Sequence, residues 1–197
     1  MFLVGEKIGE VLKPYKDIIV FVVVLFAANY FWKFTVKGDE YDMVVTWFGL
    51  DITAPFAWLA EVTTNAVYWI VSQFRDTIYM VDAITLKFDS GSSTKIVWGC
   101  TPIKQSFIWL CIMLATAGSW KSKAWFIPFG WVCIFVFNIL RIAAITLFIE
   151  YHPEWFNVLH KYIFKYMFYG MMFLLWVWYV EKLRGPVADI GKAECAS

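Results

Sequence analysis

Three residues in this sequence have side chains suited to acyl-transfer chemistry: Cys100, Arg141 and His160. A cysteine thiolate is a strong nucleophile, an arginine can stabilise an oxyanion, and a histidine can move protons near neutral pH. Each lies at or within a long apolar segment. At ~1.5 Å of helical rise per residue, their heights above the flanking charged residues are about 31, 27 and 31 Å. The sequence therefore predicts that all three lie at one level.

The residues that follow Cys100 favour the start of a helix. Thr101 fits an N-cap and Pro102 the first helical position, which would place the thiol at the positive end of the helix dipole. Lys104 and Arg141 are candidates for the cation that would stabilise a thiolate. The alternative is that Cys100 is a small buried residue that fills a gap in the packing.

Arg141 stands in an apolar stretch, where a charge is costly and typically marks a functional interior site. Asn138 lies one helical turn away on the same face and is predicted to orient the guanidinium. The alternative is that Arg141 extends to the outer lipid head groups. A polar pair on one helix face favours the functional interpretation.

The two histidines differ in their surroundings. His160 begins the last apolar segment at the predicted level of Cys100, whereas His152 precedes Pro153 and fits the cap of a short external helix. Glu61 either lines an external cavity or faces water. The cysteines form no CxxC pair and no His/Cys cluster with metal-ligand spacing, so we expect no metal and no cofactor.

The composition places these residues in a membrane. Of 197 residues, 61% are apolar and 21% aromatic, and the mean hydropathy is +0.62. Soluble domains are about 45–50% apolar. The net charge of +1 gives no support to nucleic-acid binding. We therefore expect one multi-pass membrane domain over residues 1–197, with membrane lipid as its surroundings.

The predicted fold is an all-α membrane protein with about four transmembrane helices and a small external cap. A span requires about 20 mostly apolar residues, and the matching segments are 18–34, 103–120, 124–149 and 162–180. Segment 54–74 carries polar residues and is predicted to be an external interfacial helix. Segments 77–86 and 94–98 are predicted to pair as a hairpin. The cap would cover residues 36–99 and the catalytic helical core residues 100–181.

Clusters of basic residues predict the orientation, because Lys and Arg in short loops favour the cytoplasm. Three clusters predict the same side of the membrane, provided that segment 54–74 does not cross the membrane. They are Lys7, Lys13 and Lys16, then Lys121 and Lys123, then Lys182 and Arg184. The sequence thus predicts a cytoplasmic (inner) membrane protein with both termini cytoplasmic and Cys100 outside. We interpret the first span as a retained anchor rather than a cleaved signal peptide. Cys111 and Cys133 would lie in the membrane and Cys195 in the cytoplasm, so none is well placed to form a disulfide with Cys100, and we interpret Cys100 as a reactive external thiol.

The order of Cys100, then Asn138-x-x-Arg141 within a span, then His160 at the start of the last span resembles the exosortase/archaeosortase family of membrane cysteine transpeptidases. The resemblance is most specific over residues 54–180, and the short chain looks like the compact subtypes. Members often have Ser-Gly after the cysteine, whereas Thr101-Pro102 stands here. The resemblance implies Cys100 as the nucleophile, with Arg141 and His160 as its catalytic partners.

The family implies cleavage of C-terminal sorting tails on secreted proteins, through a thioester acyl-enzyme at the extracytoplasmic face. The expected partners are those tails and an acceptor nucleophile that the sequence does not identify. The competing interpretation is a non-enzymatic scaffold or small transporter subunit with a polar interior site. A serine or metal-dependent intramembrane protease is disfavoured, because the sequence has neither Gly-x-Ser-x-Gly nor His-Glu-x-x-His.

Overall fold

The computed structural model describes residues 15–39 and 43–183, and it is mainly helical. The longer helices are α2 (Lys16–Thr35), α3 (Thr53–Ser72), α4 (Ile103–Ala115), α5 (Trp120–Ile149) and α7 (Phe164–Trp178). The short turns around α7 are η3 (Pro153–Trp155), α6 (Phe156–Val158), and two π-helical turns, η4 (Leu159–Ile163) and η5 (Tyr179–Leu183).

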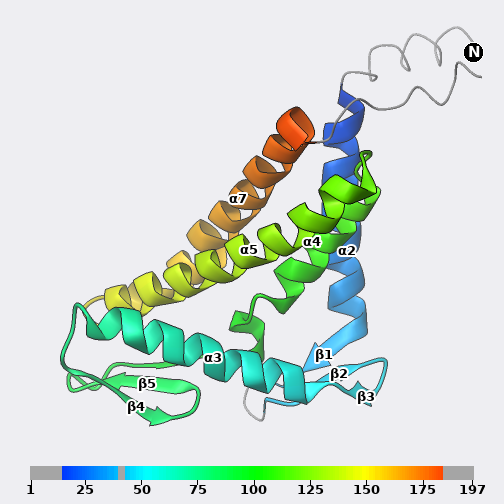
Figure 1. Ribbon diagram of the computed structural model, residues 1–197. Helices are drawn as coiled ribbons and strands as arrows, with labels where there is room; N and C mark the ends of the chain where they lie inside the picture. The colour runs from blue at the N-terminus through cyan, green and yellow to red at the C-terminus, as the bar shows by residue number, and fades with distance from the viewer. Residues whose placement is uncertain (1–14, 40–42, 184–197) are drawn as a thin grey trace, which may run out of the picture.

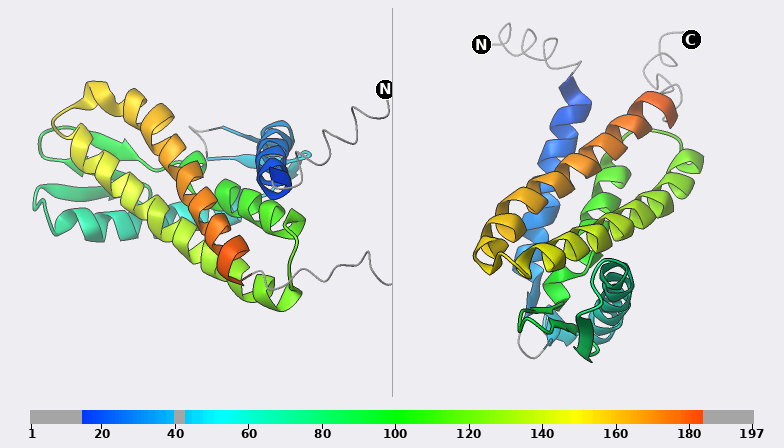
Figure 2. Two further views of the ribbon diagram at one scale, coloured as in Figure 1. Left: turned by 90° about the horizontal axis from the view of Figure 1, so that it is seen from above. Right: turned by 90° about the vertical axis from the view of Figure 1, so that its left-hand side faces the viewer.

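The helices divide into two sets by direction. Figure 1 shows α2, α4, α5 and α7 running between two ends of the molecule, with α5 oblique, whereas α3 lies across one end. In the right-hand view of Figure 2, α3 is seen nearly end-on while α2 is seen along its length. α3 therefore does not run with the other four long helices, although it packs against the last part of α5.

The four predicted spans are confirmed only in part. By length and hydropathy, α2 and α5 are the described helices able to cross a membrane. The prediction of a span over 103–120 is too long, since α4 ends at Ala115. Thr116 adopts an extended conformation, and Gly118 has a φ of 148°, so the chain leaves the helix there. α7 itself has 15 residues, and η4 and η5 lengthen the helical run on both sides.

Two small antiparallel sheets lie at the same end as α3 (Figure 1). The first contains β1 (Val36–Gly38), β2 (Val45–Trp47) and β3 (Leu50–Asp51) in that order, and the second contains β4 (Ile78–Asp82), β5 (Thr85–Phe88) and β6 (Ser93–Lys95) in that order. The sequence analysis missed the first sheet, because strands of two or three residues are too short to show a periodic pattern.

The predicted hairpin between 77–86 and 94–98 is only part of the structure that forms there, and the sequence did not define its register. The first of these segments contains all of β4, a tight turn and the start of β5. The turn forms because Asp82 Oδ1 accepts a hydrogen bond of 2.9 Å from the Ile84 backbone N–H. β5 then pairs with β6, with Leu86 opposite Thr94. The result is a three-stranded sheet in place of a single hairpin.

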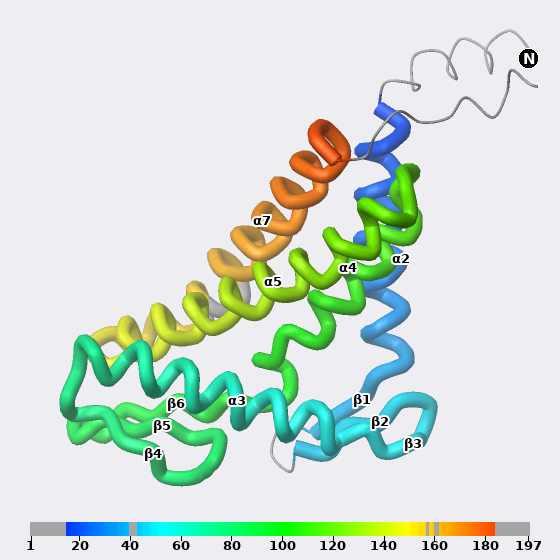
Figure 3. The backbone as a smooth tube through the Cα atoms, viewed as in Figure 1, coloured from blue at the N-terminus to red at the C-terminus, as the bar shows by residue number. Residues whose placement is uncertain are grey.

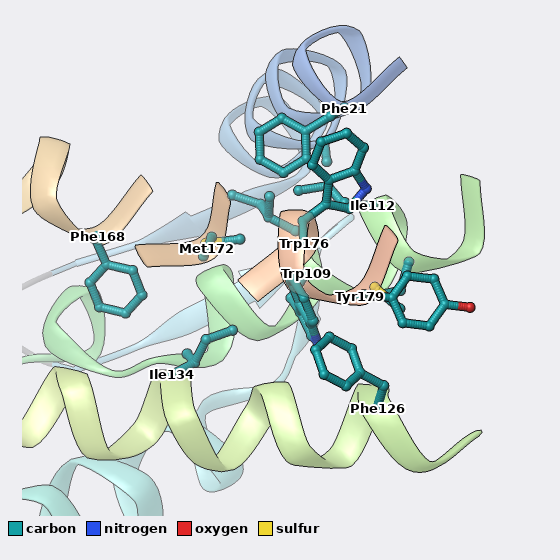
Figure 4. Packing of buried hydrophobic residues seen from close by; sticks show 12 residues of the cluster. Phe21, Trp109, Ile112, Phe126, Ile134, Phe168, Met172, Trp176 and Tyr179 are labelled. Atoms are coloured by element: carbon teal, nitrogen blue, oxygen red, sulfur yellow. The ribbon is translucent and has the colours of Figure 1, made fainter. Parts of the chain in front are cut away.

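Aromatic side chains from four helices form the core of the bundle, shown in Figure 4. Trp109 of α4 is fully buried and donates a hydrogen bond of 3.3 Å from Nε1 to the Ile127 carbonyl of α5. Gly130 permits this approach, since a Cβ there would overlap the Trp109 indole. Phe21 of α2 packs on Trp176 of α7 with ring centroids 4.9 Å apart. The first and last of these helices are thus joined directly.

The α4–α5 connection and the end of the α7 helical run lie together, opposite the cap. Ser122 Oγ donates a hydrogen bond of 2.7 Å to the Leu183 carbonyl. Lys123 is buried, and its Nζ donates to the Leu114 carbonyl in the last turn of α4. Figure 1 shows the start of α2 at this same end. The described basic residues used for orientation therefore gather at one end, whereas Lys7, Lys13, Arg184 and Cys195 lie outside the described residues.

Gly130→Ala should lower the thermal unfolding temperature of the detergent-solubilised protein. The added methyl group must displace Trp109 from α5, and overpacking of this kind costs about 1–3 kcal/mol. Gly170→Ala on α7 is the control, because a Cβ there meets nothing within 4 Å. The control should keep or raise the unfolding temperature, since alanine favours a helix over glycine by ~1 kcal/mol. Equal shifts in the two variants would contradict this packing.

The orientation predicted from the basic residues can be tested with reporter fusions. Fusions after Lys123 and after Leu183 should both report the cytoplasm, and a reporter inserted at Gly91, in an exposed turn of the cap, should report the outside. Alkaline phosphatase activity reports the external side, and green fluorescent protein fluorescence reports the cytoplasmic side. Phosphatase activity from either cytoplasmic position would reverse the topology.

Candidate active site

Cys100 ends a short 3-10 turn, η2 (Trp98–Cys100), that leads from the cap into α4. Its backbone N–H donates a hydrogen bond of 2.8 Å to the Val97 carbonyl. The predicted capping differs in detail. Pro102 precedes the first helical residue, Ile103, and the Thr101 hydroxyl donates back to the Trp98 carbonyl at 2.7 Å. Thr101 therefore stabilises η2 and does not cap α4, but Cys100 still lies at the N-terminal end of that helix.

The cap fixes the position of η2 through Trp98. The Trp98 ring packs edge-on against Phe56 of α3, with centroids 6.1 Å apart. It also covers Gly38 of β1, where a Cβ would lie 2.7 Å from the ring. Cys100 itself is partly buried against the apolar cluster that α3, the second sheet and α5 share. Both parts of the cap thus determine where the thiol lies.

Asn138 joins α5 to the cysteine. Its side chain is fully buried, and Nδ2 donates a hydrogen bond of 2.9 Å to the Cys100 carbonyl. The sequence analysis predicted that Asn138 would orient Arg141, but the structure shows a contact to the backbone of Cys100. Asn138 therefore holds the segment that carries the thiol, one helical turn from the arginine.

Arg141 is directed into the protein. Its exposed fraction is 8%, and its guanidinium lies over the Phe168 ring, 5.8 Å from the centroid. The burial argues against the alternative that Arg141 extends to the lipid head groups. Cys100, in its thiolate form, interacts electrostatically with this guanidinium. A nearby cation favours the thiolate, which is the reactive form of cysteine.

A pocket of about 470 Å³ opens beside these residues between η2, α4, α5 and α7. Its lining residues are Gly99, Lys104, Gln105, Arg141, Tyr162, Lys165, Phe168 and Tyr169. Lys104 was predicted to support the thiolate, and it lies in this wall. The charges that act on Lys104 are those of Lys165 and Lys33. Sequence reasoning missed Lys165 and Tyr169, because neither stands in a recognisable motif.

His160 belongs to η4, the π-helical turn at the start of the last helical run. Its side chain lies outside the described part of the structure. Tyr162 of the same turn lines the pocket with Arg141, so the backbone that carries His160 borders the site. π-Helical turns occur frequently at functional sites. The tube in Figure 3 shows α7 beginning beside the oblique α5.

His152 is placed differently. It stands at the N-cap position of η3, as predicted, and its Nδ1 lies 3.2 Å from Glu154 Oε1 on the surface. It does not line the pocket beside Arg141. Among the described residues, no group of three or more His, Cys, Asp and Glu side chains is placed to hold a metal.

The structure alters the argument that placed Cys100, Arg141 and His160 at one level. That argument assumed a continuous helix from Cys100 to Lys121, whereas α4 spans only Ile103–Ala115. The height that Cys100 gains along α4 is therefore smaller than assumed. The height that Arg141 gains along α5 is also smaller than assumed, because α5 runs obliquely (Figure 1). Cys100 and Arg141 still lie near enough to interact electrostatically, for a different geometric reason.

Comparison with known proteins gives one family. Residues 40–186 match the sequence model described as transmembrane exosortase. The matched segment includes the cap except β1, together with η2, α4, α5, α7 and the candidate site residues Cys100, Lys104, Asn138, Arg141 and His160. The comparisons with curated proteins and with solved structures find no match.

Replacing Asn138 by Leu should slow the alkylation of Cys100 several-fold at neutral pH. The Cys100 carbonyl loses its donor, so the segment moves and the thiolate loses part of its contact with Arg141. Peptide mass spectrometry after timed iodoacetamide labelling measures the rate. Asn65→Leu, on the exposed side of α3, is the control. An unchanged Cys100 rate in a folded Asn138→Leu variant would contradict this role.

Proposed function

Because this chain belongs to the transmembrane exosortase family, we propose that it is a membrane cysteine transpeptidase that cleaves C-terminal sorting tails of secreted proteins. The observation that carries the proposal is the placement of Cys100 beside the buried Arg141, with Asn138 holding the Cys100 carbonyl. A nucleophile that interacts with a buried cation, where that cation lines a pocket, has the arrangement that acyl transfer needs.

In the first half-reaction, Cys100 Sγ attacks the carbonyl carbon of the scissile peptide bond. The carbonyl oxygen becomes an oxyanion, which the Arg141 guanidinium stabilises. The C–N bond then breaks, and the departing amine takes a proton from His160. The products are a thioester on Cys100 and the released tail.

In the second half-reaction, an acceptor attacks the thioester carbonyl. His160 accepts the proton of the acceptor, and the Cys100 sulfur leaves as a thiolate beside Arg141. An amine acceptor gives a transpeptidase and water gives a protease. We propose that both steps occur at the extracytoplasmic face of the cytoplasmic membrane, where the sorting tails would lie.

Co-expression with a tail-bearing secreted substrate tests the proposal. Cys100→Ala should abolish the processed product, and Arg141→Lys should reduce it severely, because a point charge does not reproduce the planar guanidinium. His160→Ala should lower the rate by roughly 10²–10⁴-fold through loss of proton transfer. Immunoblots of the substrate measure the product, and mass spectrometry defines its new end.

The controls use residues of the same types elsewhere in the chain. Cys111→Ala and Cys133→Ala remove partly buried thiols of α4 and α5, and His152→Ala removes a surface histidine. All should keep processing near the wild-type level. Full processing by a Cys100→Ala variant would contradict the hypothesis that this chain is the enzyme. A non-enzymatic scaffold with a polar interior site would then be the better explanation.

A further inference from the structure

Cations gather around the pocket at the mouth of the candidate site. Lys104 lies in the first turn of α4, Lys165 lies near the start of α7 and Arg141 belongs to α5. Lys33, in the last turn of α2, adds its charge to the same neighbourhood. These residues come from four helices, so the accumulation is a product of the fold and not of a basic stretch of sequence.

The pocket contains no matching negative charge among the described residues. Its lining side chains include no Asp or Glu. The charges acting on Lys104 are the like charges of Lys165 and Lys33, which repel it. Such an arrangement costs free energy unless an anion is bound.

Arg141 provides a second, independent indication of a ligand. It is more than nine-tenths buried, and its Nε has no hydrogen-bond partner within the described residues. A buried donor of this kind costs about 1–3 kcal/mol if it stays unpaired. Since Arg141 lines the pocket, a ligand oxygen there can supply part of the missing interaction.

We propose that this pocket binds a phosphate group, with Lys104 and Lys165 as its principal ligands and Lys33 adding to the field. Phosphate fits better than a single carboxylate, because its several oxygens can meet cations arriving from separate helices. Lysines act as point charges toward phosphate and need no planar alignment. The aromatic residues Tyr162, Phe168 and Tyr169 supply the apolar wall of the pocket.

The phosphate has two possible sources, a phospholipid head group and a soluble phosphate. Basic pockets between membrane helices bind lipid head groups, and this pocket lies between α4, α5 and α7 at the cap end of the bundle. The inference rests on the proposed function only in placing the phosphate next to the reacting thiol. Binding itself needs no catalysis.

The test uses the full chain carrying Cys100→Ala, purified in detergent and examined by native mass spectrometry. It is titrated with dioleoylphosphatidylglycerol, with dioleoylglycerol as the same lipid without phosphate, and with inorganic phosphate. We expect phosphatidylglycerol to bind at least tenfold more tightly than dioleoylglycerol. Lys104→Gln/Lys165→Gln should remove this preference, since each lysine near a membrane surface contributes ~1 kcal/mol toward anionic lipid.

Matched variants separate the site from general effects of charge and folding. Lys16→Gln/Lys121→Gln removes the same charge at the opposite end of the bundle and should leave binding unchanged. Lys104→Arg/Lys165→Arg keeps the charge and should retain binding. Inorganic phosphate that binds alone and displaces the lipid would assign the site to a soluble phosphate.

Equal binding of the two lipids with no binding of inorganic phosphate would overturn the proposal. So would undiminished phosphatidylglycerol binding by a folded Lys104→Gln/Lys165→Gln variant, or an acidic peptide that binds where phosphate does not. Substrate processing by the chain with Cys100 is measured separately. If the Cys100→Ala chain with both lysines shows no lipid discrimination while the chain with Cys100 processes its substrate normally, only the phosphate site is overturned. If discrimination is present but processing is absent, only the transpeptidase is overturned.

Discussion

A guanidinium buried among membrane helices is the constraint on which the arrangement around the site depends. An arginine at the centre of a membrane helix costs about 2.5–3.5 kcal/mol by insertion measurements, and this is the upper limit of the cost at Arg141, which lies in the last third of α5. Arg141 offsets part of this cost through the face of Phe168 and the electrostatic contact with Cys100. α7 must therefore cover α5 at this level, and η2 must approach from the other side. The interaction with Cys100 that offsets part of the cost of burying Arg141 is therefore also the one on which the proposed chemistry depends.

The cap meets this constraint by holding a short turn in place. η2 has only 3 residues, so its own hydrogen bonds do little to stabilise it. Its position depends on Trp98, which packs between Gly38 and Phe56. Asn138 then fixes the Cys100 carbonyl from the bundle side. The nucleophilic role proposed for Cys100 needs its position to be defined within a fraction of an ångström. Contacts from two sheets, α3 and α5 provide that definition for a residue that lies between secondary-structure elements.

The sequence predicts the parts of this protein that follow strong local rules. Long apolar runs located α2 and α5 to within a few residues, and the order of Cys100, Asn138, Arg141 and His160 led to the family that the match over residues 40–186 confirms. α4 was predicted too long, because its end depends on the backbone conformation of four connecting residues. Lys165 was missed because its role comes from facing α4 across the pocket, and helix-to-helix geometry leaves no signal in a single sequence. The catalytic assignment of the site residues stays a prediction.

The hydrogen bonds of the α4–α5 connection have a consequence for how the protein is made. Lys123 reaches Leu114, and Trp109 reaches Ile127, across a short separation along the chain. Contacts this local form early, so the two helices can pair as a hairpin while synthesis continues. The contact between Phe21 and Trp176 instead joins the beginning of the described chain to its end. The wall that α7 contributes to the pocket beside Arg141 is absent until α7 has been synthesised, which comes after the other described long helices, and until then the nascent chain carries Cys100 without a completed pocket.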